Sequence, residues 1–404
     1  MKFFMFHLMP WPHLPADFEQ HHKSAWVTCP NTYYDATRGT VVYNNYLDQL
    51  QSAEPLGFDG VCINEHHQNA YGNMPSPNLI AASLARNTTR AKIAVVGNAL
   101  PLYDHPIRVA EEIAMLDVIT GGRIISGQVI GHGPEYYSYG VNPTYARERF
   151  REAHELIIKA WTDDGPFSWE GKHYNLRYVN LWPKPVQKPH PPIWIPGIGS
   201  METMEYVAKK RFCYFALPYF HFDIYRRNFE QFRECCRKEG YEMDPEQAGY
   251  LIPIHVAETD EQAREEYQPH LWYFMKKLLL LPPELGFPPG YITPRSYQNV
   301  VGSFTRKNYM GTQNTWEDLM DGHFILAGSP ATVREQLLYI LKELGTGIIL
   351  CLFQIGSMPH DLTLKSMNLF ATQVMPQVRA EIDRSLAHRL GAATAPAVMQ
   401  EARA

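Results

Sequence analysis

Short apolar segments rich in Val, Ile and Phe alternate with longer segments of helical periodicity along nearly the whole chain. This alternation is typical of repeated β–α units, in which helices cover both faces of a parallel sheet. Eight strands are predicted, at residues 3–8, 60–64, 92–99, 123–129, 192–196, 213–217, 249–256 and 347–353. The pattern therefore indicates an α/β protein with a parallel sheet.

A helix is predicted after each strand from apolar residues at helical spacing. These helices fall at residues 41–53, 77–86, 106–119, 146–162, 201–210, 223–239, 261–281 and 330–344, with a last helical segment at 361–389. Eight strand–helix repeats favour a closed barrel, because an open sheet would leave two edges to protect. No G-x-G-x-x-G motif follows the first strand, which weakens a dinucleotide-binding alternative. We predict one (β/α)₈ TIM barrel domain over residues 1–390.

Three segments are longer than a minimal barrel needs, at about residues 9–40, 167–190 and 282–321. The second is predicted to be a short hairpin that turns at residues 169–172, and the third a long irregular stretch. Long loops in compact domains often act as lids or binding loops. In a TIM barrel the loops after the strands build the active site at the C-terminal mouth. The Ala-rich residues 391–404 are expected to form a disordered tail.

Charge and hydropathy exclude several classes of protein. The formal net charge is −5, with acidic and basic residues interleaved and no basic block, so nucleic acid is not an expected partner. No run of eighteen apolar residues predicts a membrane span, and the first residues lack the apolar core and cleavage site of a signal peptide. The six cysteines form no C-x-x-C motif and are expected to be reduced. A cytoplasmic protein is expected.

The densest group of chemically active side chains is Glu65-His66-His67, directly after the second predicted strand. Its position places two imidazoles at the barrel mouth, and histidine is suited to proton transfer near neutral pH. One alternative is that both histidines are structural. Another is a metal site, but adjacent residues of an extended strand point to opposite faces and no zinc-type spacing is present. We expect a proton-transfer role and no metal.

A glycine-rich turn, Gly197-Ile198-Gly199-Ser200, joins the fifth strand to its helix. Glycines allow close approach of a ligand, and free backbone N–H groups at a helix start suit a phosphate. An ordinary capped turn, with Ser200 as the cap, explains the same residues. In the segment before the fourth strand, Arg123 and Asp117 are as readily structural as functional.

Together these segments resemble the bacterial luciferase-like flavin-dependent monooxygenases. The motifs that carry the resemblance occur in order from residue 1 to about residue 210, and more loosely to residue 330. They are Leu56–Gly60 with Glu65–His67, Pro75–Asn78, Val95–Pro101, His105–Glu112, Leu116-Asp117, Gly121–Arg123, Gly197–Ser200 and Ala327–Pro330.

The resemblance implies a barrel that binds reduced FMN at its mouth, with the FMN reduced by a separate flavin reductase. It makes His66 the catalytic histidine, with His67 and Glu65 as its partners. The Asn98-Ala99 bond falls where the family often has a strained or cis bond under the flavin ring. The resemblance further implies cofactor contacts from Gln128, His132, Tyr136, Gly197, Gly199 and Ser200.

In one respect the chain departs from luciferase, which has a fourth-strand arginine for the flavin phosphate where this chain has Ile130. The aromatic-rich loops, with Met9, Trp11 and Tyr71, are expected to cover a small organic, apolar or ring-bearing substrate that reacts with O₂. A homodimer is also expected from the resemblance. Alternatives are a deazaflavin-dependent dehydrogenase on the same barrel, a non-catalytic flavin-binding protein and a metal-dependent barrel hydrolase.

Overall fold

Eight parallel strands close into a barrel in the computed structural model, which describes residues 1–393 except 306, 307 and 312. Neighbours around the barrel follow chain order, and β11 pairs with β1 to complete the ring, with Phe4 opposite Leu350. The barrel strands are β1 (Lys2–His7), β2 (Gly60–Ile63), β3 (Lys92–Ala99), β4 (Ile124–Val129), β7 (Ile193–Gly197), β8 (Cys213–Ala216), β9 (Ala248–Val256) and β11 (Ile348–Leu352). The predicted fold class is confirmed.

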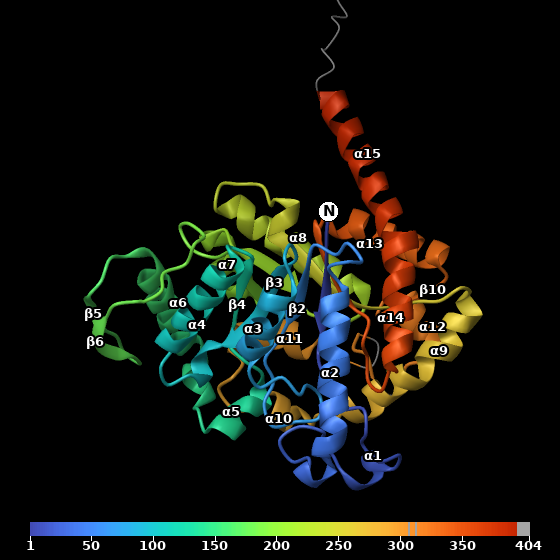
Figure 1. Cartoon of the computed structure of the whole chain (residues 1–404), viewed down its shortest axis with the longest axis horizontal. Coiled ribbons are helices and arrows are strands. Elements are labelled where there is room, and N and C mark those ends of the chain that lie inside the picture. The colour runs from blue at the N-terminus through green and yellow to red at the C-terminus, as the bar shows by residue number, and fades with distance from the viewer. Residues whose placement is uncertain (306–307, 312, 394–404) are drawn as a thin grey trace, which may run out of the picture.

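Helices surround the barrel as predicted (Figure 1). They are α2 (Ala36–Ser52), α3 (Pro77–Asn87), α4 (Ile107–Thr120), α6 (Ala146–Thr162), α7 (Met201–Lys210), α8 (Phe222–Lys238), α9 (Asp260–Tyr273) and α13 (Pro330–Leu344). The π-helical segment Phe274–Leu278 continues α9. The chain closes with α14 (His360–Leu369), the π-helical segment Phe370–Val374 and α15 (Met375–Ala393).

The strands read as continuous apolar runs because helices and barrel interior bury both of their faces. Every residue of β9 and of β11 is buried. The insertion at 167–190 contains the predicted hairpin, formed by β5 (Phe167–Glu170) and β6 (Asn175–Val179). Its turn lies at residues 171–174 rather than 169–172, because Trp169 and Glu170 already pair with β6.

Two predicted loops contain helices. Helix α2 begins five residues earlier than expected, because the Asp35 side chain accepts a hydrogen bond from the Arg38 N–H (2.8 Å) and caps the helix. The first loop also contains α1 (Phe18–His21) and a 3₁₀ turn at Asn31–Tyr33.

The third insertion is not irregular throughout. It contains α10 (Pro283–Gly286), α11 (Pro294–Val301) and α12 (Trp316–Asp321), followed by a three-residue strand, β10 (Leu326–Gly328), beside β9. These elements are too short to produce a clear periodicity. In the predicted tail, residues 391–393 belong to α15, and residues 394–404 lie outside the described part of the chain.

The carboxyl ends of the strands lie at the end of the barrel where α1, α5 (Gly133–Tyr139) and α10 gather, opposite the labelled N-terminus (Figure 1). Helices α1 and α5 belong to the loops that follow β1 and β4, and α10 belongs to the third insertion, after α9. The mouth is therefore the part of the barrel where chemistry is expected.

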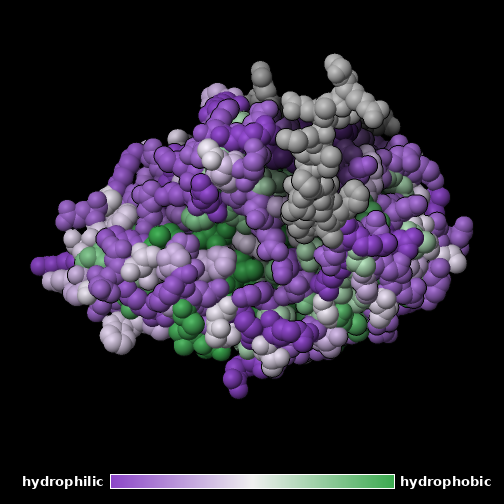
Figure 2. Space-filling model, turned by 90° about the horizontal axis from the view of Figure 1, so that it is seen from above, coloured by the Kyte–Doolittle hydropathy of each residue, from purple (hydrophilic) through white to green (hydrophobic). Residues whose placement is uncertain are grey.

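Several large apolar side chains are exposed on α3 and α4, among them Leu79 (71% exposed), Met115, Val118 and Ile119. Figure 2 shows apolar side chains gathered at one side of the face seen from above, among mostly polar ones. The predicted homodimer stays a prediction, and we expect it to use this surface. None of the helices described here is long and apolar enough to cross a membrane.

Arg123 has a structural role. Its guanidinium and Nε donate to the carbonyls of Ala85, Thr88, Ala91 and Thr120 and to the Thr88 hydroxyl, over distances of 2.7–3.2 Å. We expect Arg123→Met to lower the free energy of unfolding by about 2–4 kcal/mol, because buried carbonyls lose their donors. Urea unfolding measures the change. Arg108→Met, which removes an exposed pair with Glu112, is the control and should have no measurable effect; an equal loss in both variants would contradict the assignment.

Candidate active site

A cavity of about 210 Å³ lies at the barrel mouth. Its floor and walls come from the ends of β2, β3, β4 and β7 and from the start of α7, and residues Phe287, Tyr291, Ile292 and Val300 of the third insertion cover it. The Tyr291 hydroxyl donates to the Gly131 carbonyl (2.7 Å), which fastens this cover to the loop after β4. The lining is mainly apolar, with a few charged groups at opposite ends.

At one end of the cavity His66 and Glu135 form a dyad. His66 Nδ1 lies 2.9 Å from Glu135 Oε1, and the Glu135 side chain is 1% exposed. Burial alone raises the pKa of Glu135, but hydrogen bonds and charge from His66, with the nearby His132, lower it overall. The carboxylate therefore accepts from His66 Nδ1, which leaves Nε2 as the nitrogen available to a ligand.

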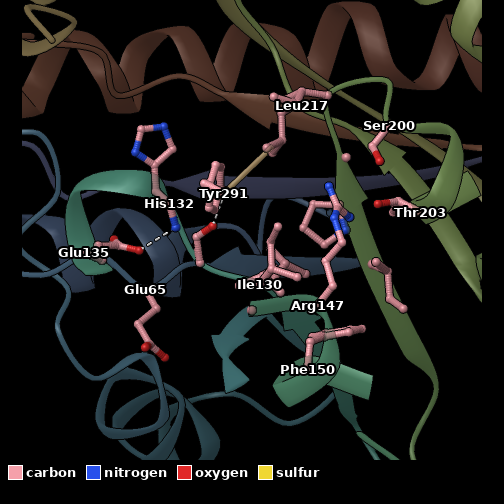
Figure 3. A pocket seen from close by; sticks show the side chains of 18 of the residues that line it. Glu65, Ile130, His132, Glu135, Arg147, Phe150, Ser200, Thr203, Leu217 and Tyr291 are labelled. Atoms are coloured by element: carbon pink, nitrogen blue, oxygen red, sulfur yellow. Dashed lines mark hydrogen bonds between the residues drawn. The ribbon is translucent and has the colours of Figure 1, made fainter. Parts of the chain in front are cut away.

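Glu135 is placed by the start of α5. Its second oxygen accepts from the His132 backbone N–H (2.7 Å), the reciprocal bond of a helix capping box (Figure 3). His132, a predicted cofactor contact, lines the cavity, and its ring stacks on Trp26 at 4.9 Å. Burial lowers the pKa of His132 to about 4, so this imidazole is neutral at physiological pH.

His67 and Glu65 form a second pair next to the first. His67 Nε2 donates to Glu65 Oε1 (2.8 Å), and the other Glu65 oxygen accepts from the Tyr103 hydroxyl (2.8 Å). Burial lowers the pKa of His67, but the Glu65 carboxylate outweighs it and the net pKa is raised. Glu65 lines the cavity and His67 does not. The two histidines therefore face different partners, as expected for adjacent residues after a strand.

At the end of β3 the backbone itself lines the cavity. The non-prolyl cis bond joins Val96 to Gly97, two residues before the predicted Asn98-Ala99 bond. A Cβ on Gly97 would lie 2.4 Å from the Gly127 carbonyl carbon, so β3 and β4 approach each other here as only glycine permits. Asn98 and Ala99 do not line the cavity. The Asn98 side-chain amide and the Ala99 backbone N–H donate to Glu65 Oε2 (3.3 and 3.4 Å).

Arg147 and Arg151 occupy the other end of the cavity. They lie one turn apart on α6 and so share a face of the helix. Arg147 is half-buried, its Nε is buried without a hydrogen-bond partner, and neither arginine has an ion pair within the described part of the chain. Figure 3 shows Arg147 extending toward Ser200 and Thr203, with His132 and Glu135 on the opposite side of the cavity. Two guanidinium groups without ion pairs, that of Arg151 exposed and lying over the Tyr206 ring, stand beside Thr203 and could hold an anion.

The turn before α7 is glycine-rich, as the sequence indicates, but the Ser200 side chain does not cap the helix. Gly199 has a φ of +99°, and a Cβ there would lie 2.9 Å from the Asn228 side chain, so the turn requires glycine. Gly197 and Ser200 line the cavity, whereas Gly199 does not. The Ser200 side chain makes no helix cap and instead donates to Glu202 Oε2 (2.9 Å).

Glu202 is the unexpected acidic group at this end. Its carboxylate accepts from Ser200, from Thr293 (2.6 Å) and from Ser296. Burial alone raises the pKa of Glu202, but these hydrogen bonds lower it to about 2. Glu202 thereby connects α7 to the third insertion. Thr203 also lines the cavity.

Two predicted cofactor contacts face elsewhere. Residues alternate along β4, so Val129 lines the cavity and Gln128 points outward to α6, where His154 Nδ1 lies 2.6 Å from its Oε1. Tyr136 is buried beside Tyr291, and its hydroxyl donates to the Ile130 carbonyl. Tyr136 therefore positions Ile130, which lines the cavity.

The three residues predicted to cover the substrate, Met9, Trp11 and Tyr71, lie in different places. Tyr71 stacks on Trp26 at 4.5 Å and meets the His66 ring edge-on at 5.0 Å. Trp11 lines a second cavity, of about 670 Å³, whose wall also includes His66. Met9 lines neither cavity and is buried beneath the second one, where its carbonyl accepts from the Asn73 N–H (2.7 Å).

Sequence reasoning missed Glu135, Arg147, Arg151 and Glu202. Signals for three of them exist. Glu135 stands three residues after His132 with Pro134 between them, which is a helix-start pattern. Arg147 and Arg151 stand four residues apart on a predicted helix. Glu202 has no sequence signal, because its partners Thr293 and Ser296 are about ninety residues away.

Comparison with protein families gives a match to the family described as luciferase-like monooxygenases, over residues 24–346. Among curated relatives, an uncharacterized protein of Sinorhizobium fredii, y4wF, is 29% identical over 84% of this chain and 94% of its own length. The 3,6-diketocamphane 1,6-monooxygenase of Pseudomonas putida is 24% identical over 72% of this chain and 81% of its own.

Solved structures share the fold. The oxygenating constituent of 3,6-diketocamphane monooxygenase from Pseudomonas putida, in complex with FMN, is similar with a TM-score of 0.68 and 22% identity, over 93% of this chain and 98% of that one. An F420-dependent secondary alcohol dehydrogenase is similar with a TM-score of 0.62 and 17% identity, over 83% of this chain and 94% of that one. The barrel alone does not distinguish the two cofactors.

The hydrogen bonds of Glu202 predict a pH dependence of stability. A carboxyl whose pKa is about 2 in the folded protein and near its ordinary 4.5 when unfolded stabilises the fold above pH 4.5. That contribution is lost as the pH falls from about 4.5 to 2. We expect Glu202→Gln to lose less stability across this interval than the wild type, measured by urea unfolding at several pH values. Glu335→Gln, an exposed control on α13, should follow the wild type; identical curves for wild type and Glu202→Gln would contradict the assignment.

Proposed function

The chain belongs to the luciferase-like monooxygenase family, and we propose that it is the oxygenase of a two-component system that uses reduced FMN and O₂ to oxygenate a small organic substrate. The observation that carries the proposal is the polarity of one cavity. Unpaired arginines and hydroxyls lie at one end, and a histidine held by a buried carboxylate lies at the other. A phosphate-bearing cofactor that needs proton management at its far end suits this arrangement.

The residues present fit FMN. The buried, unpartnered Nε of Arg147 calls for an acceptor, and Arg151, Ser200 and Thr203 stand around the same end of the cavity. Arg147, Arg151 and Thr203 would hold the phosphate, next to Ser200, whose hydroxyl already donates to Glu202. Arg147 and Arg151 thus take the role that the fourth-strand arginine has in luciferase, where this chain has Ile130. Apolar contacts from Ile130, Phe150 and Leu217 would accept the body of the cofactor.

Reduced flavin, when bound, supplies the electrons and the site that activates O₂. The chain supplies the surroundings. Glu135 holds His66 by Nδ1, so that Nε2 can hold or release a proton on the cavity side. The cover formed by Phe287, Tyr291 and Ile292 would limit the access of water to the reaction. We propose that a separate flavin reductase delivers the reduced cofactor, in keeping with the similar structure that is called an oxygenating constituent.

A deazaflavin-dependent dehydrogenase is the alternative that the shared barrel leaves open. Deazaflavin carries a longer acidic tail, which calls for an extended basic surface beyond the first phosphate. Here Glu202 and Glu205 follow the phosphate turn, and Lys209 and Lys210 lie at the far end of α7. The local charge therefore favours a single phosphate and supports FMN.

Comparison of FMN with riboflavin tests the phosphate site. We expect Arg147→Met to weaken FMN binding about 10- to 100-fold, because a charge-assisted hydrogen bond to the phosphate is lost. Riboflavin has no phosphate, so its affinity should stay unchanged. Fluorescence titration measures both ligands. Lys159→Met, on the exposed side of the same helix, is the control; equal losses for both flavins in Arg147→Met would place the phosphate elsewhere.

Reoxidation of the flavin tests the oxygen chemistry. We expect the protein to bind reduced FMN anaerobically and, after mixing with aerated buffer, to slow the return of absorbance at 450 nm at least tenfold relative to free reduced FMN, because residues of the third insertion cover the cavity and limit the access of water. The variant His66→Ala should keep its FMN affinity and change this rate. Failure to bind reduced FMN, with binding of reduced deazaflavin instead, would sink the proposal.

A further inference from the structure

The second cavity, which we call the outer chamber, differs from the first in its charge. It is lined by residues of the first insertion, of the loop after β2 and of α2, and by His66, which it shares with the first cavity. None of its described lining residues is Asp, Glu, Lys or Arg, whereas the first cavity contains two arginines and three glutamates. An ion would have no partner in the outer chamber, so its ligand is neutral.

The lining of the outer chamber is aromatic and is held in place. Trp11 packs against Tyr34 at 4.6 Å, and its indole N–H donates to the Tyr33 carbonyl (3.1 Å). The Tyr43 hydroxyl is also committed, to the Asn73 carbonyl (2.6 Å). Fixed ring faces whose polar groups, the Trp11 indole N–H and the Tyr43 hydroxyl, already have partners suit a flat, ring-bearing molecule.

One polar group in this lining lacks a partner. The Asn73 side-chain Nδ2 is buried and donates to no acceptor among the described residues. The neighbouring Asn69 amide, in contrast, donates to the His67 carbonyl and accepts from the Gly72 N–H. The Asn73 backbone is fixed at both ends, by Met9 and by Tyr43. A buried donor without an acceptor is costly unless a ligand supplies one.

Two residues at or near the outer chamber have a strained backbone conformation. Met9 and Gln68 have φ values of +54° and +52°, in the left-handed region that residues with side chains avoid. Gln68 lines the chamber, and the Met9 carbonyl holds Asn73. Such strain persists where surrounding contacts fix it and concentrates at ligand sites.

We propose that the outer chamber binds the substrate, a neutral ring-bearing compound with an acceptor oxygen that receives a hydrogen bond from Asn73 Nδ2. His66 lines both cavities, so a ligand in the outer chamber lies beside the same histidine that faces the first cavity. Only the identification of the ligand as the substrate rests on the proposed function. The binding site itself is inferred from the residues that line the outer chamber.

Calorimetric titration of the flavin-free, full-length protein tests the chamber with three probes. 1-Tetralone is a neutral ring with a carbonyl, tetralin lacks the oxygen, and 1-naphthoate carries a negative charge. We expect 1-tetralone to bind about five- to tenfold more tightly than tetralin, and 1-naphthoate to bind least. Asn73→Leu should remove the preference for 1-tetralone and leave tetralin unchanged. Asn44→Leu, on the exposed face of α2, is the matched control.

A second variant keeps the test independent of Asn73. Val27→Trp adds an indole to the chamber wall and should weaken binding of both neutral probes, while FMN affinity stays at the wild-type value. Unchanged probe binding in Val27→Trp, an equal loss of both probes in Asn73→Leu, or tightest binding of 1-naphthoate would overturn the proposal. If the probes behave as expected but reduced FMN does not bind, the chamber stands and the proposed function fails. If reduced FMN binds and no neutral probe does, the chamber assignment alone fails.

Discussion

The buried carboxylate of Glu135 is the interaction on which the site depends. One oxygen accepts from the His132 backbone at the start of α5, and the other accepts from His66 after β2. A single side chain therefore ties the loop after β4 to the loop after β2 and fixes the ring of His66. Because Glu135 is almost fully buried, losing either hydrogen bond would leave one carboxylate oxygen buried without a donor.

Charge divides the mouth of the barrel into two compartments. The cavity with Arg147 and Arg151 suits an anionic cofactor, and the outer chamber has no charged lining residue among those described. His66 stands between them. This division explains how one barrel mouth can hold a charged cofactor and a neutral molecule at two separate places. Each ligand would bind less favourably in the other compartment. The third insertion closes the first compartment and is held to α7 through Glu202.

The barrel could be predicted from the sequence because its strands are buried on both faces and its helices are amphipathic, so periodicity carries the information. The position of Glu65-His66-His67 followed from the end of a strand. Gln128 and Asn98 were misplaced because strand alternation decides which face a residue presents, and a shift beside Gly97 changes it. Glu202 and the outer chamber were beyond prediction because their contacts join segments far apart in the chain, such as Thr293 with α7.

A crystal structure of the protein with FMN tests the central claim most directly. The account predicts that the phosphate lies between the Arg147 guanidinium and the Thr203 hydroxyl, that the ring system reaches the Val96-Gly97 backbone with His66 beside it, and that the outer chamber stays free of the cofactor. A flavin bound in the outer chamber, or a phosphate bound away from Arg147, would contradict it.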